Sequence, residues 1–110
     1  MIRICAAHEI DEGQTKSFEA QGQPCFLLRH EGRLYGYINR CPHLGIELNW
    51  KPDHFLDVEK IHIQCSTHGA LFLPHNGYCI EGPCRGQSLK ALPVFEQAGD
   101  IHCHIEDVLQ

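Results

Sequence analysis

CPHLG at residues 41–45 and CSTHGALF at residues 65–72 are the two stretches that decide the fold. Each stretch joins one cysteine to one histidine: Cys41 to His43, and Cys65 to His68. A glycine follows each histidine within two residues and lets the backbone turn sharply. The pattern predicts two tight loops that carry two thiolates and two imidazoles. Such a donor set suits a metal centre with sulfur on one side and nitrogen on the other.

The two loops resemble the cluster-binding loops of the Rieske ferredoxin family. Two later features match the same family: Asn76-Gly77 is similar to its turn, and Gly82-Pro83 to the proline loop that shields the cluster. The resemblance covers roughly residues 38–85. It implies one [2Fe-2S] cluster, with two cysteines on one iron and two histidines on the other. The implied ligands in this chain are Cys41, His43, Cys65 and His68.

The spacing between the loops departs from the family pattern. Residues 44–64, which number 21, separate His43 from Cys65, a few more than is usual in small Rieske ferredoxins. The excess falls in residues 49–60, between the loops, and need not disturb the site. This segment is either a surface excursion anchored by its aromatic side chains or a docking element for an electron partner.

The ligand set predicts the charge of the cluster and its redox class. Two ferric ions, two sulfides and two thiolates carry no net charge, so reduction is easier than for a dianionic four-cysteine cluster. High-potential Rieske proteins add a disulfide between the loops and two hydroxyl donors to sulfur. The matching residues here are Ile46 and Thr67 for the disulfide, and Ala70 and Phe72 for the hydroxyls. The resemblance therefore implies a low-potential cluster.

Two other metal sites compete for these residue types. A structural Cys₂His₂ zinc site fits the same four ligands, but zinc fingers usually place two cysteines before two histidines on a helix. His102, His104 and Glu106 alternate on one face of a predicted strand, like the triad of non-haem iron oxygenases. A straight strand would spread them over roughly 13 Å, which disfavours one shared ion.

The seven cysteines do not indicate a disulfide scaffold, because their number is odd and no export signal precedes them. Five remain beyond the predicted ligands: Cys5, Cys25, Cys79, Cys84 and Cys103. Most lie in apolar, strand-like runs, where a free cysteine is a small buried hydrophobe. Cys84 is the exception, since it follows Gly82-Pro83 and should lie beside the cluster.

The composition predicts one globular domain of 110 residues, with 43% hydrophobic residues and a net charge of −5. No signal peptide or membrane span is visible. We therefore expect a cytoplasmic protein without nucleic-acid or membrane partners.

Alternating patterns predict an all-β fold. We expect a strand at 3–7, a hairpin of 24–30 with 33–39 around Glu31-Gly32, and a strand at 61–64. A second hairpin is expected at 70–74 with 78–80, and further strands at 89–95 and 101–105. Only residues 55–58 hint at a short helical turn. A cluster-binding lobe of about 38–85 would then be inserted in a base formed by about 1–37 and 86–110.

The resemblance implies a one-electron carrier and not an enzyme, because about 25 residues after the proline loop leave no room for a catalytic domain. The expected partners are a flavin- or NAD(P)H-dependent reductase and a terminal oxygenase or reductase. Two alternatives stay open. One is a non-catalytic small subunit of a nitrite-reductase-like complex, and the other is a redox-sensing or interaction module.

Overall fold

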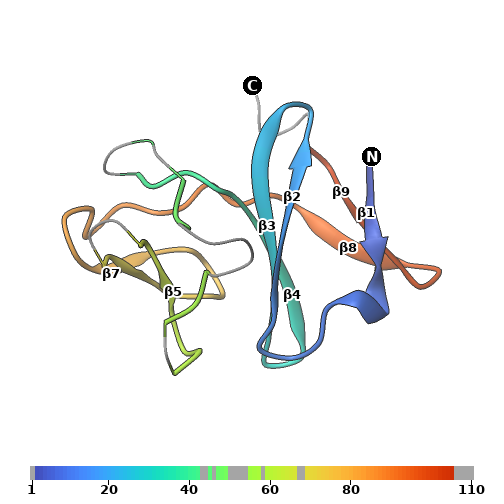
Figure 1. The fold of residues 1–110 in the computed structure, drawn as a ribbon, viewed down its shortest axis with the longest axis horizontal. Coiled ribbons are helices and arrows are strands. Elements are labelled where there is room, and N and C mark those ends of the chain that lie inside the picture. The colour runs from blue at the N-terminus through green and yellow to red at the C-terminus, as the bar shows by residue number, and fades with distance from the viewer. Residues whose placement is uncertain are drawn as a thin grey trace.

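The computed structural model describes residues 2–42, 45, 47–49, 55–57, 59–66 and 69–105 (Figure 1). These residues form three antiparallel sheets of three strands each. Their helical structure is one 3-10 turn, η1 (Ala7–Glu9), and it has neither the length nor the apolar character to span a bilayer. The predicted all-β class is confirmed.

Two of the sheets form the base. The first has the order β2-β3-β4, with β2 at Thr15–Ala20, β3 at Gln23–His30 and β4 at Arg33–Ile38. The second has the order β1-β9-β8, with β1 at Ile2–Ala6, β9 at Asp100–Cys103 and β8 at Val94–Gln97. The second sheet thus pairs segments from opposite ends of the sequence.

The third sheet belongs to the part of the chain that carries the cysteine loops. Its order is β5-β6-β7, with β5 at Ile63–Gln64, β6 at Leu71–Phe72 and β7 at Cys79–Glu81. Figure 1 shows β5 and β7 on one side of the β2-β3-β4 sheet, and β1, β8 and β9 on the other.

Strand β3 is buried on both faces and joins the two halves of the molecule. Its residues from Cys25 to Leu28 are all fully buried, and alternate side chains of a strand point to opposite faces. Cys25 and Leu27 accordingly belong to core clusters of the base, whereas Phe26 and Leu28 belong to the cluster that contains the cysteine loops. This double burial explains the continuous apolar run in the sequence.

Aromatic side chains fix the third sheet to the base. The rings of Phe26 and Phe55 stack, with centroids 4.2 Å apart and planes 9° from parallel. The Tyr37 hydroxyl donates to the carbonyl oxygen of Pro74 over 2.5 Å, from within the core. The segment between the loops is therefore anchored through Phe55, although residues 50–54 and 58 lie outside the described part of the chain.

Several predicted strands need correction. Strand β2 was not expected, because Thr15–Ala20 is mostly polar and lies half exposed. The strand expected at 89–95 is wrong as one element: residues 88–92 pair first with Tyr78 and then with Tyr37, and regular structure begins only at β8. The strand expected at 101–105 is Asp100–Cys103. The possible helical turn is an extended segment, in which Leu56 pairs with Ile63.

Candidate metal centre

Cys41 begins a closed turn directly after β4. Its side chain is 1% exposed, and its carbonyl oxygen accepts a hydrogen bond of 2.7 Å from the Gly45 N–H. Gly45 has a φ of +72°, a conformation that residues with a Cβ adopt only at a cost. The glycine therefore allows the chain to close behind the cysteine.

Cys65 follows β5 and begins a turn of the same construction. It is 0% exposed, and its carbonyl oxygen accepts a hydrogen bond of 2.9 Å from the Gly69 N–H. Gly69 has a φ of +69°. In both loops the glycine stands four residues after the cysteine, so the sequence pattern and the backbone geometry agree.

A buried asparagine and two backbone groups tie the first loop to the second. The Asn39 side chain, in a residue that is 5% exposed, accepts from the Leu48 N–H over 2.7 Å and donates to Asn49 over 2.8 Å. The Leu48 carbonyl oxygen in turn accepts from the Ser66 N–H over 2.7 Å. The residue after Cys65 is thus bonded directly to the segment that follows the first loop. Asn39 was not predicted, and its only signal in the sequence is its place two residues before Cys41.

The predicted proline loop packs against the second cysteine loop. A Cβ built on Gly82 would lie 2.8 Å from the Ala70 Cα, so these two backbones are in close contact. The Ala70 carbonyl oxygen accepts from the Cys65 N–H over 2.9 Å. Gly82 therefore contacts Ala70, which is itself hydrogen-bonded to Cys65.

Four cysteines share the core around these loops: Cys41, Cys65, Cys79 and Cys84. Burial, the hydrogen bond with Cys79 and the nearby thiols of Cys79 and Cys41 together raise the pKa of the Cys84 thiol to about 12. Cys84 thus lies in the same core cluster as the two predicted cysteine ligands.

The described residues fit the sulfur half of a two-cysteine, two-histidine centre. Cys41 and Cys65 are buried thiols outside any disulfide, and the loop of Cys65 is hydrogen-bonded to the segment that follows the loop of Cys41. A dry, preformed setting of this kind suits thiolate ligands. His43 and His68 lie outside the described residues. Within the described ranges no group of three or more histidine, cysteine or acidic side chains could hold a metal ion.

The alternative triad, which begins in β9 with His102 and continues beyond it, is not assembled by the residues described. His102 and His104 both stack on Phe95, with ring centroids 5.5 and 5.3 Å from it. Glu106 is outside the described part of the chain. The two imidazoles therefore pack on an aromatic ring of the neighbouring strand.

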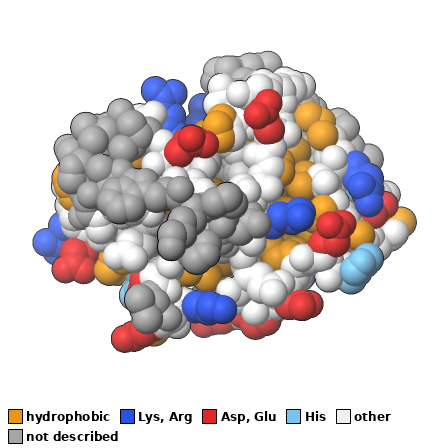
Figure 2. Space-filling model, viewed as in Figure 1, with side chains coloured by type: hydrophobic (Ala, Val, Ile, Leu, Met, Phe, Trp, Pro, Cys, Tyr) orange, Lys and Arg blue, Asp and Glu red, His pale blue; other side chains and the backbone are white. Residues whose placement is uncertain are grey.

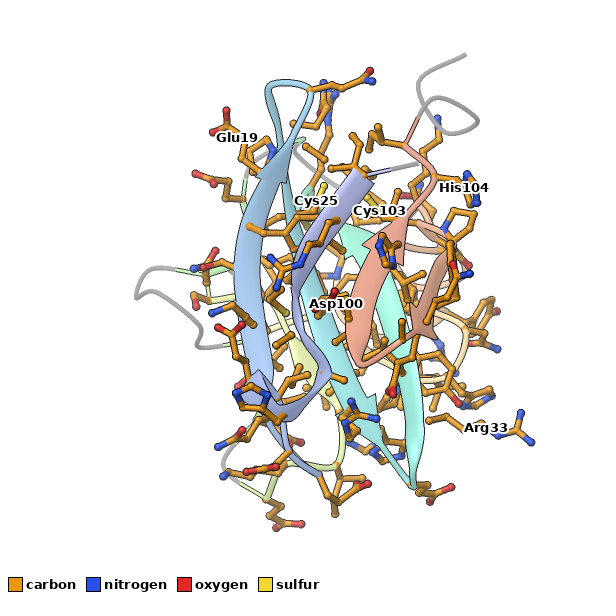
Figure 3. The ribbon with its side chains drawn as sticks, turned by 90° about the vertical axis from the view of Figure 1, so that its right-hand side faces the viewer. Glu19, Cys25, Arg33, Asp100, Cys103 and His104 are labelled. Atoms are coloured by element: carbon orange, nitrogen blue, oxygen red, sulfur yellow. The ribbon has the colours of Figure 1, made fainter. Side chains whose placement is uncertain are left out.

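The remaining cysteines are buried, as predicted for small hydrophobic side chains. All seven are buried and lie outside any disulfide. Cys25 and Cys103 belong to one core cluster of the base, where Figure 3 shows them between β3 and β9. Burial raises the pKa of Cys25 to about 11.

Among the described residues on the face shown in Figure 2, acidic and basic side chains are intermixed. This mixture is consistent with the modest formal net charge of −5. Nucleic-acid binding modules instead concentrate lysine and arginine on one face.

A family model and curated relatives match this chain. The family described as Rieske [2Fe-2S] domain matches residues 1–104. The terminal oxygenase component of carbazole 1,9a-dioxygenase from Metapseudomonas resinovorans is 29% identical over 94% of this chain and 28% of its own length. The ferredoxin component of an alkene monooxygenase system from Xanthobacter autotrophicus is 30% identical over 43% of this chain and 38% of its own length. The chain thus spans well under half of either relative.

Solved structures share the fold. The reduced complex between oxygenase and ferredoxin in carbazole 1,9a-dioxygenase contains a chain with a TM-score of 0.80 and 27% identity, over 92% of this chain and 27% of that one. The ferredoxin of carbazole 1,9a-dioxygenase from Nocardioides aromaticivorans IC177 has a TM-score of 0.75 and 20% identity, over 93% of this chain and 94% of that one. The second similarity extends over nearly the whole of both chains and bears on the fold alone.

Proposed function

The chain belongs to the Rieske [2Fe-2S] domain family, which binds a [2Fe-2S] cluster, and on this premise we propose that it is a one-electron carrier. The observation that supports the proposal is the pair of buried thiols on two turns of the same construction. The Ser66 N–H of the second loop also donates to the carbonyl oxygen of Leu48, which follows the first turn. The cluster supplies a site that gains and loses one electron.

We propose that the thiolates of Cys41 and Cys65 bind one iron and that ring nitrogens of His43 and His68 bind the other. The spacing of the two loops supports this assignment. The protein contributes three things: it holds the thiolates in fixed turns, it keeps water from them by burial, and it covers the second loop with Gly82. A rigid, dry shell keeps ligand geometry constant when charge changes.

The proposed partners are a flavin- or NAD(P)H-dependent reductase as donor and a terminal oxygenase or reductase as acceptor. Relatives support the acceptor, since one is the ferredoxin component of an alkene monooxygenase system and another structure is a complex of oxygenase and ferredoxin. We propose that the chain has no catalytic site of its own. The cytoplasmic location stays a prediction.

Iron, sulfide and electron counting tests the proposal. The purified protein should contain about two irons and two acid-labile sulfides per chain and should take up one electron from dithionite. Replacing Cys65 with Ser should remove the cluster, whereas replacing the buried Cys5 should leave it. Stoichiometric zinc without sulfide would overturn the cluster assignment, and uptake of two electrons per chain would contradict a single carrier site.

Electron transfer to a partner separates this function from the alternatives. The reduced protein should be reoxidised by a terminal oxygenase of the aromatic-ring type in a concentration-dependent reaction. Reoxidation only by a sirohaem nitrite reductase would favour the small-subunit alternative. A protein that no electron acceptor reoxidises would favour a redox-sensing or interaction module.

A further inference from the structure

Two thiols outside the proposed ligand set are in direct contact. The Sγ atoms of Cys79 and Cys84 lie 3.1 Å apart, with the Cys84 thiol donating to Cys79. The Cys79 thiol donates to the carbonyl oxygen of Glu81 over 3.2 Å. Both residues are buried, at 0% and 1% exposure.

The backbone holds the two thiols together. Cys79, the first residue of β7, donates its N–H to the Gln87 carbonyl oxygen over 2.8 Å, and its own carbonyl oxygen accepts from the Gly86 N–H over 3.2 Å. Residues 79–87 therefore form a closed turn, in which Gly86 and Gln87 are hydrogen-bonded back to the backbone of Cys79. Cys84 lies inside this turn, so its approach to Cys79 is set by the fold and not by side-chain rotation alone.

An exposed turn covers the pair. Gly82, Pro83, Arg85, Gly86 and Gln87 are all exposed, whereas the two sulfur atoms beneath them are buried. Exposed turns of this kind open locally at a lower free energy than the whole protein unfolds. Opening of residues 82–87 would bring a small oxidant to the thiols without disturbing the sheets.

We propose that Cys79 and Cys84 form a redox-active dithiol that hydrogen peroxide converts to an intramolecular disulfide. One sulfur attacks the peroxide oxygen, the O–O bond breaks, and a sulfenic acid and one water form. The second sulfur then displaces the hydroxyl group, which leaves as a second water. The two thiols lose two electrons to the peroxide, and their two protons end in water. Bond formation requires the sulfur atoms to move from 3.1 Å to about 2.05 Å.

The disulfide would act on the turn that carries Gly82. It would close a covalent ring from Cys79 to Cys84, and this ring contains Gly82 and Pro83. Because Gly82 packs on Ala70, oxidation would hold the turn against the second cysteine loop. The site itself depends only on the two thiols, so it does not rest on the proposed electron-carrier function.

Peptide mapping of the intact protein tests the proposal. The purified holoprotein is treated with hydrogen peroxide, quenched with catalase, denatured, alkylated with iodoacetamide and digested. The expected result is a Cys79–Cys84 cross-linked peptide, two fewer alkylated cysteines per chain, and full reversal by dithiothreitol. Cys84→Ser should abolish the cross-link, while Cys5→Ser, which alters a buried cysteine of the base, should retain it.

Three results would overturn the proposal: complete alkylation of Cys79 and Cys84 after peroxide, oxidation that stops at sulfinic acid on one of them, or a cross-link that joins other cysteines. The wild-type map decides between these results even when a variant fails to fold. Iron and sulfide are counted on the same sample. A preparation without iron and sulfide would contradict the proposed function. The Cys79–Cys84 cross-link can still be measured in such a preparation, so the two proposals are tested separately.

Discussion

Gly82 has no side chain, and the atoms around it leave no room for one. Its φ is +109°, and a Cβ would lie 2.8 Å from the Ala70 Cα and 2.9 Å from the Ala70 Cβ. Gly86 offers a matched control in the same turn, because its φ is +92° but no atom lies within 4 Å of an added Cβ. Both replacements by alanine strain the backbone, and only one forces the turn away from the second cysteine loop.

We predict that Gly82→Ala lowers the free energy of unfolding by about 1–3 kcal/mol more than Gly86→Ala, because of the added clash. The Gly82 variant should also lose its visible absorption faster under a chelator, since the turn no longer covers the loop. Urea unfolding and chelator bleaching measure the two effects. Equal losses for both variants would show that the turn does not press on Ala70.

The Tyr37 hydroxyl is a second single group with a measurable role. Tyr37→Phe deletes the donor to Pro74 and leaves a buried carbonyl oxygen without it. The variant should lose about 1–3 kcal/mol of unfolding free energy. Tyr78 is 43% exposed, so Tyr78→Phe serves as the control and should change little. Similar values for both variants would contradict a structural role for the Tyr37–Pro74 bond.

Residue-level prediction from the sequence succeeds where the chemistry is local. The spacing of cysteine and glycine in each loop predicted turns that the structure confirms. Each turn is closed by a hydrogen bond from the glycine N–H to the carbonyl oxygen of the cysteine four residues earlier, so it depends only on that segment. The role of Asn39 could not be predicted, because it depends on contacts with residues about ten positions away in the sequence. Its partners, Leu48 and Asn49, come close only after the first loop has folded.

The β3–β4 hairpin shows how one side chain from a distant segment supports a turn. Glu31 and Gly32 both have positive φ, at +51° and +75°, as a two-residue turn requires. The Glu12 carboxylate accepts from both of their N–H groups, over 2.8 and 2.7 Å. The bonds from Gly32 and then Glu31 lower the pKa of Glu12.

This geometry predicts a pH dependence. A lowered folded-state pKa means that the ionised Glu12 stabilises the fold above the ordinary glutamate pKa of 4.5, and that this contribution is lost as pH falls through the lower folded value. Glu12→Gln should therefore reduce the unfolding temperature at pH 7, and the difference from wild type should narrow toward pH 3. The exposed Glu19 (Figure 3) provides the control substitution, Glu19→Gln. A difference that stays constant with pH would contradict this account.

At the level of elements, the sequence predicted strands marked by apolar runs or by alternation, and it missed the polar edge strand β2. The hairpin of β3 and β4 was expected because an apolar run flanks Glu31-Gly32. Strand β2 was missed because its exposed edge is polar, and its place is set by pairing with β3. Residues 89–95 were predicted to form one strand, but this segment changes partners: the Leu89 N–H donates to the Gly77 carbonyl oxygen, and the Leu92 N–H to that of Gly36.

At the scale of the whole molecule, strand β3 contributes side chains to the core of the base and to the core around the cysteine loops. One face of this strand packs in the base and the other packs with the cysteine loops. The sequence predicted a lobe inserted in a base, but it could not show that one strand would serve both cores. All four predicted ligands stay a prediction: the structure describes where Cys41 and Cys65 lie, and His43 and His68 are outside the described residues.

The midpoint potential of the purified holoprotein tests the central claim most directly, because it depends on the whole ligand set. Ala70 and Phe72 offer no side-chain hydroxyl to the centre, and both are buried beside Cys65 in one core cluster. With two histidine ligands and no such donors, protein-film voltammetry should give a midpoint near the low end of the Rieske range, roughly −150 mV. A midpoint of about −400 mV would indicate four thiolate ligands and contradict the assignment of His43 and His68. A midpoint above about +100 mV would contradict the account of the missing hydroxyl groups.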